Sequence, residues 1–281
     1  RLEVHGNTYT GTGNGFDLER VNFCNIHDNQ VCVTGSPLLM TRDITSTNID
    51  KNNFEGTTAG NNTTTLWSGS TLTFDSSTFD ENNIISPAGD NRVMNVTGTS
   101  FDNSSVSGNK VSVASTVSTP IPFNITVADS ALRFNGNEFT ITGSSMVDRP
   151  LFVLSGTANI EADGNKVISS SVELDRSDIT CASLQFNKNT VPGLIGTCSG
   201  KVLGATSGTT QPVKLVNAPW TSVTHNHIES PVALGVASVQ FVDCAEARLI
   251  SNRLIGNSSV PLVRADDAVD LKYWGNEQTN N

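Results

Sequence analysis

The chain has 281 residues, with 27 acidic and 17 basic side chains and a formal net charge of −10 at pH 7. This acidic balance argues against a nucleic-acid partner, because no basic stripe is present to neutralise phosphates. No run approaches the roughly 18 consecutive apolar residues of a membrane-spanning helix, so we expect no transmembrane segment. The chain starts at Arg1 without Met and without a signal peptide, which predicts a segment of a longer protein.

A six-residue phrase, apolar-x-x-Asn-x-apolar, recurs from one end of the chain to the other. The third position before each Asn is apolar or aromatic, and the fourth is polar. The second position after each Asn is apolar in every copy but the last, where Gln278 stands. The asparagines of the phrase, which we call the ladder asparagines, are Asn7, Asn29, Asn52, Asn82, Asn109, Asn137, Asn165, Asn189, Asn226, Asn252 and Asn276.

This pattern predicts a short strand, a tight bend at the Asn, and a second short strand in each copy. Such strands cannot bury an apolar face alone, so successive copies must stack and both apolar columns must face inward. The asparagines can then hydrogen-bond from coil to coil, and Asn tolerates the left-handed geometry of a bend. We therefore predict an all-β parallel solenoid of about eleven coils with an internal Asn ladder.

The repeat leaves no room for a domain boundary, so residues 1–281 are predicted to form one domain. Two polar stretches, 55–65 and 192–211, interrupt the regular spacing and are predicted to be loop insertions. Solenoid insertions gather on one face, where they serve as contact sites or as tolerated decoration.

The alignment can be tested on charged residues that did not define it. In the second and third coils it places Glu19 over Arg42 and Arg20 over Asp43. Both pairs are complementary in charge, which supports the register, although exposed pairs contribute only about 0–1 kcal/mol.

These phrases resemble the right-handed parallel β-helix of the pectin-lyase-like superfamily over essentially the whole chain. The closing 273–276 phrase, Tyr-Trp-Gly-Asn, is similar to the last coil of NosD-like bacterial β-helices. The Phe-x-x-Asn phrases that begin at Phe79, Phe134 and Phe186 resemble repeats of chlamydial polymorphic outer-membrane proteins. A looser similarity is to the β-helical surface proteins of the trypanosomatid dispersed gene family. The resemblance implies a right-handed, single-stranded β-helix.

The last coils concentrate acidic residues. The alignment brings Asp243 over Asp267, with Asp266 adjoining, and Glu246 over Asp270. Stacked carboxylates about 5 Å apart repel, so they must hold a proton, bind a cation such as calcium, or pair with a base. The bases available are Arg248, Arg264 and Lys272, and their presence favours solvated salt bridges.

Polysaccharide-cleaving members of the superfamily suggest an enzymatic alternative. A hydrolase would use Asp243 with Asp267, since carboxylates about 5–9.5 Å apart suit glycoside chemistry. A lyase would bind calcium at Asp243, Asp266 and Asp267 and use Arg264 as a base or anion clamp. Of the polygalacturonase motifs only Asp266-Asp267 is present, and no Gly-His-Gly occurs. His225 and His227 form a His-x-His pair without an evident third metal ligand.

The cysteines suit an oxidising compartment if they form bridges, and the sequons permit a secreted protein. Cys24 and Cys32 lie in one coil, Cys181 and Cys198 flank another, and Cys244 is left over. They predict either two disulfides or five small buried side chains. Acceptor sequons for N-glycosylation occur at Asn61, Asn62, Asn95, Asn103, Asn124 and Asn257.

The preferred interpretation is a non-enzymatic extracellular or cell-surface β-helical rod with a structural, filament-forming or adhesive role. Its expected partners are other protein subunits, flanking domains or surface glycans, and we expect no cofactor. An open solenoid end exposes strand edges, so further chain or another subunit is expected to cover it. Glycan binding along 192–211 is a further alternative.

Overall fold

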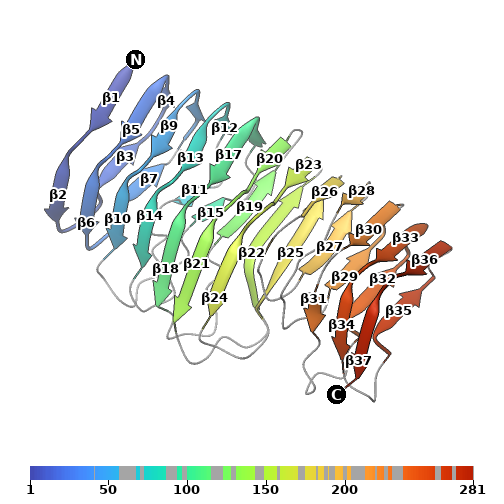
Figure 1. The fold of residues 1–281 in the computed structure, drawn as a ribbon. Helices are drawn as coiled ribbons and strands as arrows, with labels where there is room; N and C mark the ends of the chain where they lie inside the picture. Colours follow the sequence, from blue (N-terminus) through green and yellow to red (C-terminus); the bar gives the residue numbers. More distant parts are fainter. Residues whose placement is uncertain are drawn as a thin grey trace.

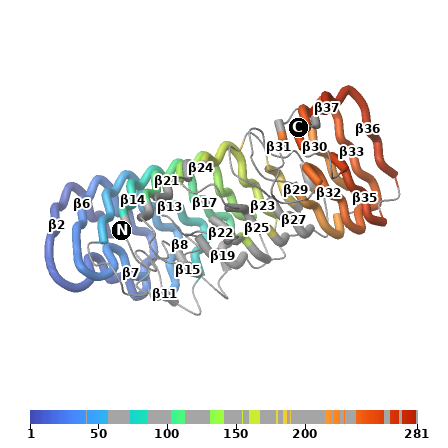
Figure 2. The backbone as a smooth tube through the Cα atoms, turned by 90° about the horizontal axis from the view of Figure 1, so that it is seen from below, coloured from blue at the N-terminus to red at the C-terminus, as the bar shows by residue number. Residues whose placement is uncertain are grey.

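The computed structural model is built from parallel β-strands that lie side by side along one long axis (Figures 1 and 2). Within the part of the chain that it describes there is no helix, and hence no helix that is long and apolar enough to cross a bilayer. The described residues are 1–40, 42–56, 68–69, 73–86, 94–96, 100–114, 123–127, 131–142, 149–156, 159–169, 175–181, 183–186, 189, 194–198, 201–203, 213–218, 220–224, 227–229, 237–256, 261–267 and 270–280.

The longest sheet, which we call sheet A, takes one strand from each coil. Neighbouring strands in it are parallel and in register, with the fourth residue before each ladder Asn forming one row. Its twelve strands are β1 (Leu2–His5), β5 (Cys24–His27), β9 (Asn48–Asp50), β13 (Thr78–Asp80), β17 (Ser104–Ser107), β20 (Ala131–Arg133), β23 (Asn159–Glu161), β26 (Ser183–Gln185), β28 (Lys201–Leu203), β30 (Trp220–Thr224), β33 (Glu246–Ile250) and β36 (Asp270–Trp274).

A second set of strands, which we call sheet B, begins directly after the ladder asparagines. Seven strands form its first part: β2 (Thr8–Gly11), β6 (Gln30–Val33), β10 (Asn53–Gly56), β14 (Asn83–Ser86), β18 (Lys110–Ala114), β21 (Glu138–Thr142) and β24 (Lys166–Ser169). Three strands form its second part near the C-terminus: β31 (His227–Glu229), β34 (Arg253–Gly256) and β37 (Glu277–Asn280).

The remaining strands close each coil. The nine-stranded sheet C comprises β11 (Ser68–Gly69), β15 (Met94–Val96), β19 (Phe123–Val127), β22 (Arg149–Gly156), β25 (Asp175–Cys181), β27 (Leu194–Cys198), β29 (Val213–Val216), β32 (Val239–Val242) and β35 (Val263–Asp266). Two small sheets belong to the N-terminal coils: β3 (Phe16–Leu18) with β7 (Leu38–Met40), and β4 (Val21–Asn22), β8 (Ile44–Thr45), β12 (Thr73–Asp75) and β16 (Ser100–Asp102).

The predicted all-β parallel solenoid is confirmed, but the predicted number of coils is wrong. Sheet A has twelve strands rather than eleven because the segment 192–211, expected to be a loop, contains β27 and β28. β28 lies between β26 and β30 and pairs with both, so this segment forms a coil of its own. The other predicted insertion, 55–65, lies outside the described residues from residue 57 onward.

The ladder asparagines join each coil to both of its neighbours. The Asn52 backbone amide donates to Asn82 Oδ1 over 3.0 Å, and Asn52 Nδ2 donates to the same oxygen over 3.0 Å. Asn52 Nδ2 also donates to the Ile26 carbonyl of the preceding coil over 2.9 Å. The bonds between successive Asn side chains connect every ladder position from Asn7 to Asn189 and connect Asn252 to Asn276. Asn226 lies outside the described residues.

Where the bend residues are described, the left-handed one is the residue before the ladder Asn, and not the Asn itself as expected. Asp28, Lys51 and Glu81 have φ of 55°, 56° and 56° at this point, and in several coils a glycine takes the place. The Asn side chain is therefore selected for its hydrogen bonds rather than for its backbone geometry.

A second ladder, built from hydroxyl groups, was not predicted. The Thr47 amide donates to Ser77 Oγ over 3.0 Å, and the Ser77 amide donates to Ser104 Oγ over 3.3 Å. All three residues are buried and stand five positions before a ladder Asn. The three hydroxyl residues form an aligned column in the sequence, five positions before the ladder Asn. This column could have been used to predict a second bend in these coils.

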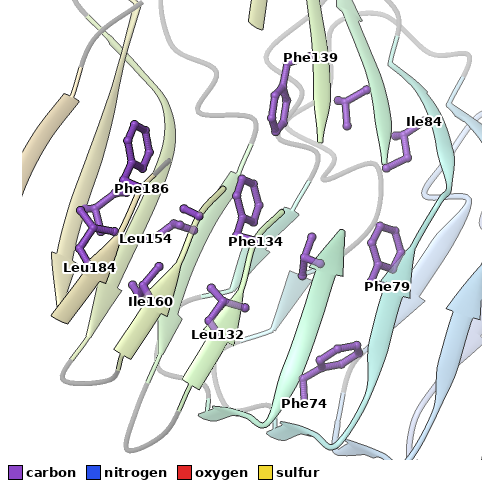
Figure 3. Close-up of a cluster of buried hydrophobic side chains, with 14 of the residues drawn as sticks. Phe74, Phe79, Ile84, Leu132, Phe134, Phe139, Leu154, Ile160, Leu184 and Phe186 are labelled. Carbon is purple, nitrogen blue, oxygen red and sulfur yellow. The ribbon is translucent and has the colours of Figure 1, made fainter. Parts of the chain in front are cut away.

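Apolar side chains from successive coils fill the space between the sheets (Figure 3). Phe79, Phe134 and Phe186, each three residues before a ladder Asn, are fully buried, as are Ile84 and Phe139 from the column after it. In the first and last coils these columns are less buried, although Tyr9 and Tyr273 are register partners of the buried Val31 and Leu249. There Tyr9 and Tyr273 are 44% and 38% exposed, because each of these coils is covered from one side only.

The charged pairs that tested the alignment lie in neighbouring coils as expected. Arg42 Nε is 3.2 Å from Glu19 Oε1, and the Val21 amide donates to the Asp43 carbonyl oxygen over 3.0 Å. The register read from the sequence therefore also holds away from the ladder.

Two adjacent asparagines allow a matched test of the ladder. Asn82 is 1% exposed, accepts hydrogen bonds from Asn52 and donates to the Ile49 carbonyl oxygen, whereas its neighbour Asn83 is exposed. Asn82→Ala leaves several buried polar groups without partners, at about 1–3 kcal/mol for each group. We expect it to lower the free energy of unfolding in urea by about 2–5 kcal/mol, and Asn83→Ala to change it little. Equal losses in the two variants would contradict a structural role specific to the ladder.

Candidate functional site

Asp243 and Asp267 occupy equivalent corners of the last two coils. They follow β32 and β35, in which Val242 and Asp266 are register partners, and they have φ of 52° and 56°. The Asp243 amide donates to the Asp266 carbonyl oxygen over 3.0 Å. Both aspartates are exposed. The two residues thus lie one strand spacing apart, about 4.8 Å, at a corner that faces solvent.

Two neighbouring side chains donate hydrogen bonds to the Asp266 carboxylate. Its Oδ1 accepts a hydrogen bond from Arg264 Nε over 2.8 Å, and its Oδ2 accepts one from Gln240 Nε2 over 2.8 Å. These bonds, that from Arg264 first, hold the pKa of Asp266 below its ordinary value. Arg264, the residue expected to act as a base or anion clamp, is therefore engaged by a carboxylate of its own strand.

A charged network covers the outer face of sheet A near its C-terminal end. Glu246 and Asp270 are register partners, as expected from the alignment. Glu246 Oε1 is 2.9 Å from Arg248 Nε, 2.8 Å from Arg248 Nη2 and 3.0 Å from Lys272 Nζ. Arg248 first, and then Lys272, lower the pKa of the Glu246 carboxyl. Lys272 Nζ is also 3.4 Å from Asp270 Oδ2, so bases lie beside both stacked acids.

Trp220 extends this network onto the preceding coil. The Arg248 guanidinium carbon lies 5.3 Å from the centroid of the half-buried Trp220 ring, within the range of a cation–π interaction. The stacking follows from the register, because Trp220 pairs with Glu246, two residues before Arg248. The repeat alignment did not predict this contact between residues that are 28 positions apart.

Among the described residues, no group of three or more His, Cys, Asp or Glu side chains is arranged to hold a metal ion. In that part of the chain, Asp243, Asp266 and Asp267 are therefore not brought together as a calcium site. Of the expected His225 and His227 pair, His225 lies outside the described residues and His227 begins β31.

A different pair of histidines stacks on the outer face of sheet A. The rings of His5 and His27 are 5.1 Å apart between centroids and nearly parallel, at 4°. His27 Nδ1 is 2.7 Å from Asp28 Oδ2, and His27 Nε2 is 3.3 Å from Glu3 Oε1. Asp28 first, and then Glu3, raise the pKa of His27.

The cysteines near the N-terminus are not bridged to each other. Cys24 and Cys32 are free thiols in different sheets, and the buried Cys244 thiol donates to the Leu215 carbonyl oxygen over 3.5 Å. Cys181 and Cys198 are register partners in neighbouring strands of sheet C.

The sequons fall in different settings. Asn103 is exposed and has a φ of 50° at a corner, while Asn95 and Asn124 are register partners in sheet C. Asn61, Asn62 and Asn257 lie outside the described residues.

Comparison of the chain with protein-family models, with curated protein sequences and with solved structures finds no match.

The Glu246 network makes a prediction about pH. A lowered pKa means that Glu246 contributes stability above the pKa of the unfolded chain, and that this contribution is lost as pH falls through the folded pKa. We expect Arg248→Gln to raise the Glu246 pKa toward its ordinary value, as measured by NMR titration of the side-chain carboxyl carbon. Arg253→Gln, which removes an exposed pair with Glu277, should leave it unchanged. An unaltered Glu246 pKa in Arg248→Gln would contradict the assignment.

Proposed function

We propose that the chain is a non-enzymatic β-helical rod of an extracellular or cell-surface protein, with a structural, filament-forming or adhesive role. The main support is the state of the acidic residues in the last coils. Glu246 and Asp266, the acids with lowered pKa, already hold Arg248, Lys272 and Arg264. A catalytic site instead requires groups positioned to meet a substrate.

The outer face of sheet A also favours a structural role. Asn48 Nδ2 donates to Asn25 Oδ1 over 3.3 Å, and Thr78 Oγ1 donates to Asn48 Oδ1 over 3.2 Å. One coil further on, Ser105 Oγ donates to Asp80 Oδ1 over 3.0 Å. These polar side chains bind the coils to one another, which suits a rod whose length and straightness matter.

The proposal includes finer features of the fold and setting. We propose a right-handed winding, as in pectin-lyase-like β-helices, because connections between parallel strands of one sheet are almost always right-handed. An extracellular setting is compatible with the exposed sequon at Asn103. The proposed partners are other protein subunits, flanking domains or surface glycans.

The enzymatic alternative is a polysaccharide lyase or glycoside hydrolase that uses Asp243, Asp267 and Arg264. What favours it is the stacking of the two exposed aspartates at successive corners. Their spacing, about 4.8 Å between neighbouring strands, is close to the roughly 5–5.5 Å between the carboxyl groups of retaining glycosidases.

A panel of immobilised neutral and acidic polysaccharides separates these functions. We expect the chain to release no oligosaccharides or unsaturated products from any member, because its acids are paired or lie on an open corner. Retention of the chain on a polysaccharide without cleavage would identify the adhesive role. If the chain neither cleaves nor is retained on any polysaccharide, the structural and filament-forming roles are left.

The contradicting outcome is cleavage that depends on the two aspartates. It would be lost in the double variant Asp243→Asn with Asp267→Asn and kept in Asp270→Asn, which changes a neighbouring exposed acid outside the proposed pair. That result would replace the structural role with the enzymatic one.

A further inference from the structure

The Asn ladder has one position without an asparagine. β28 aligns Leu203 with Gln185 and with Ser222, the residues four positions before Asn189 and Asn226. Counting four residues on from Leu203 gives Ser207 as the sequence position that corresponds to the ladder. A serine hydroxyl offers one donor and cannot reproduce an amide that donates two hydrogen bonds and accepts others. The coil of β27 and β28 therefore has a serine, and not an asparagine, at the corresponding sequence position.

Two cysteines meet in the backbone register at this coil. β25 and β27 are parallel, and their pairing runs without a shift from Ser177 with Leu194 to Cys181 with Cys198. Neighbouring strands are about 4.8 Å apart. That separation lies within the roughly 4.4–6.8 Å between Cα atoms that disulfides span.

The other cysteines are not competitors for this pair. Cys24 lies in β5 and Cys32 in β6, both near the N-terminus of the solenoid, and both are free. Cys244 is buried, and its thiol is directed to the carbonyl oxygens of Leu215 and Val242.

We propose that Cys181 and Cys198 form a disulfide that fastens the coil of β27 and β28 to the coil before it. The bond joins these two coils covalently through neighbouring strands of sheet C. It forms by exchange with a small disulfide such as oxidised glutathione. One cysteine thiolate attacks the small disulfide and releases one small thiol. The second cysteine then attacks the resulting mixed disulfide, so that two protein thiols become one disulfide and two small thiols are released.

Peptide mapping tests the bond directly in the 281-residue chain. The chain is equilibrated with oxidised glutathione, its remaining thiols are alkylated, and it is digested without reduction. We expect one linked peptide pair containing Cys181 and Cys198, with the other three of the five cysteines alkylated. Alkylation of both Cys181 and Cys198, or a link from either to any other cysteine or to a second chain, would overturn the proposal.

Stability gives a second measurement. Closing a loop of about 17 residues lowers the unfolding equilibrium constant by about 100-fold. We expect the urea midpoint of the oxidised chain to fall on reduction, and this response to disappear in Cys181→Ser and in Cys198→Ser but to persist in Cys32→Ser. If either of the first two variants fails to fold, the mapping of the unsubstituted chain still decides the outcome. An identical response to reduction in all folded variants would contradict the assignment.

Discussion

The hydrogen bonds of the ladder amides are the constraint on which the rest of this structure depends. Asn109 is fully buried, and its Nδ2 donates to the Phe79 carbonyl oxygen of the coil before it and to Asn137 Oδ1 of the coil after it. One side chain thus binds three coils at a single spacing. Because a buried amide without partners is costly, an Asn in one coil favours an Asn at the same point of the next, while the length of the coil between two asparagines is free to vary.

The core and the corners follow from that fixed point. With the ladder Asn at the bend, alternation along the flanking strands sends the third residue before it and the second after it inward, where Phe134 and Phe139 stack at 6.1 Å between ring centroids. The residue before the Asn must adopt a left-handed conformation, which glycine does at least cost and which Asp28 and Lys51 also adopt. The intervening positions face outward, and they carry the polar and charged variation of the chain.

The proposed function rests on the polar and charged side chains that face outward from the coils. Side chains from successive coils meet at strand spacing, so opposite charges and hydrogen-bonding groups pair along the rod. Glu246 binds Arg248 of its own strand and Lys272 of the next one, and Arg248 lies over Trp220 of the strand before. A surface whose charged groups are engaged with one another suits a structural element better than a catalytic centre, which keeps groups available for substrate.

The sequence by itself determined the parallel solenoid and its register, because the repeated Asn and its two apolar columns mark the same physical point in each coil. The pairing of Glu19 with Arg42 followed from that register alone. The coil of β27 and β28 was hidden, since it is rich in Gly, Ser and Thr and has no ladder Asn. The tertiary structure alone decided that Arg264 holds Asp266 rather than standing free, and that Arg248 covers Trp220. Such contacts depend on how side chains of neighbouring strands turn toward one another, which a repeat pattern does not specify.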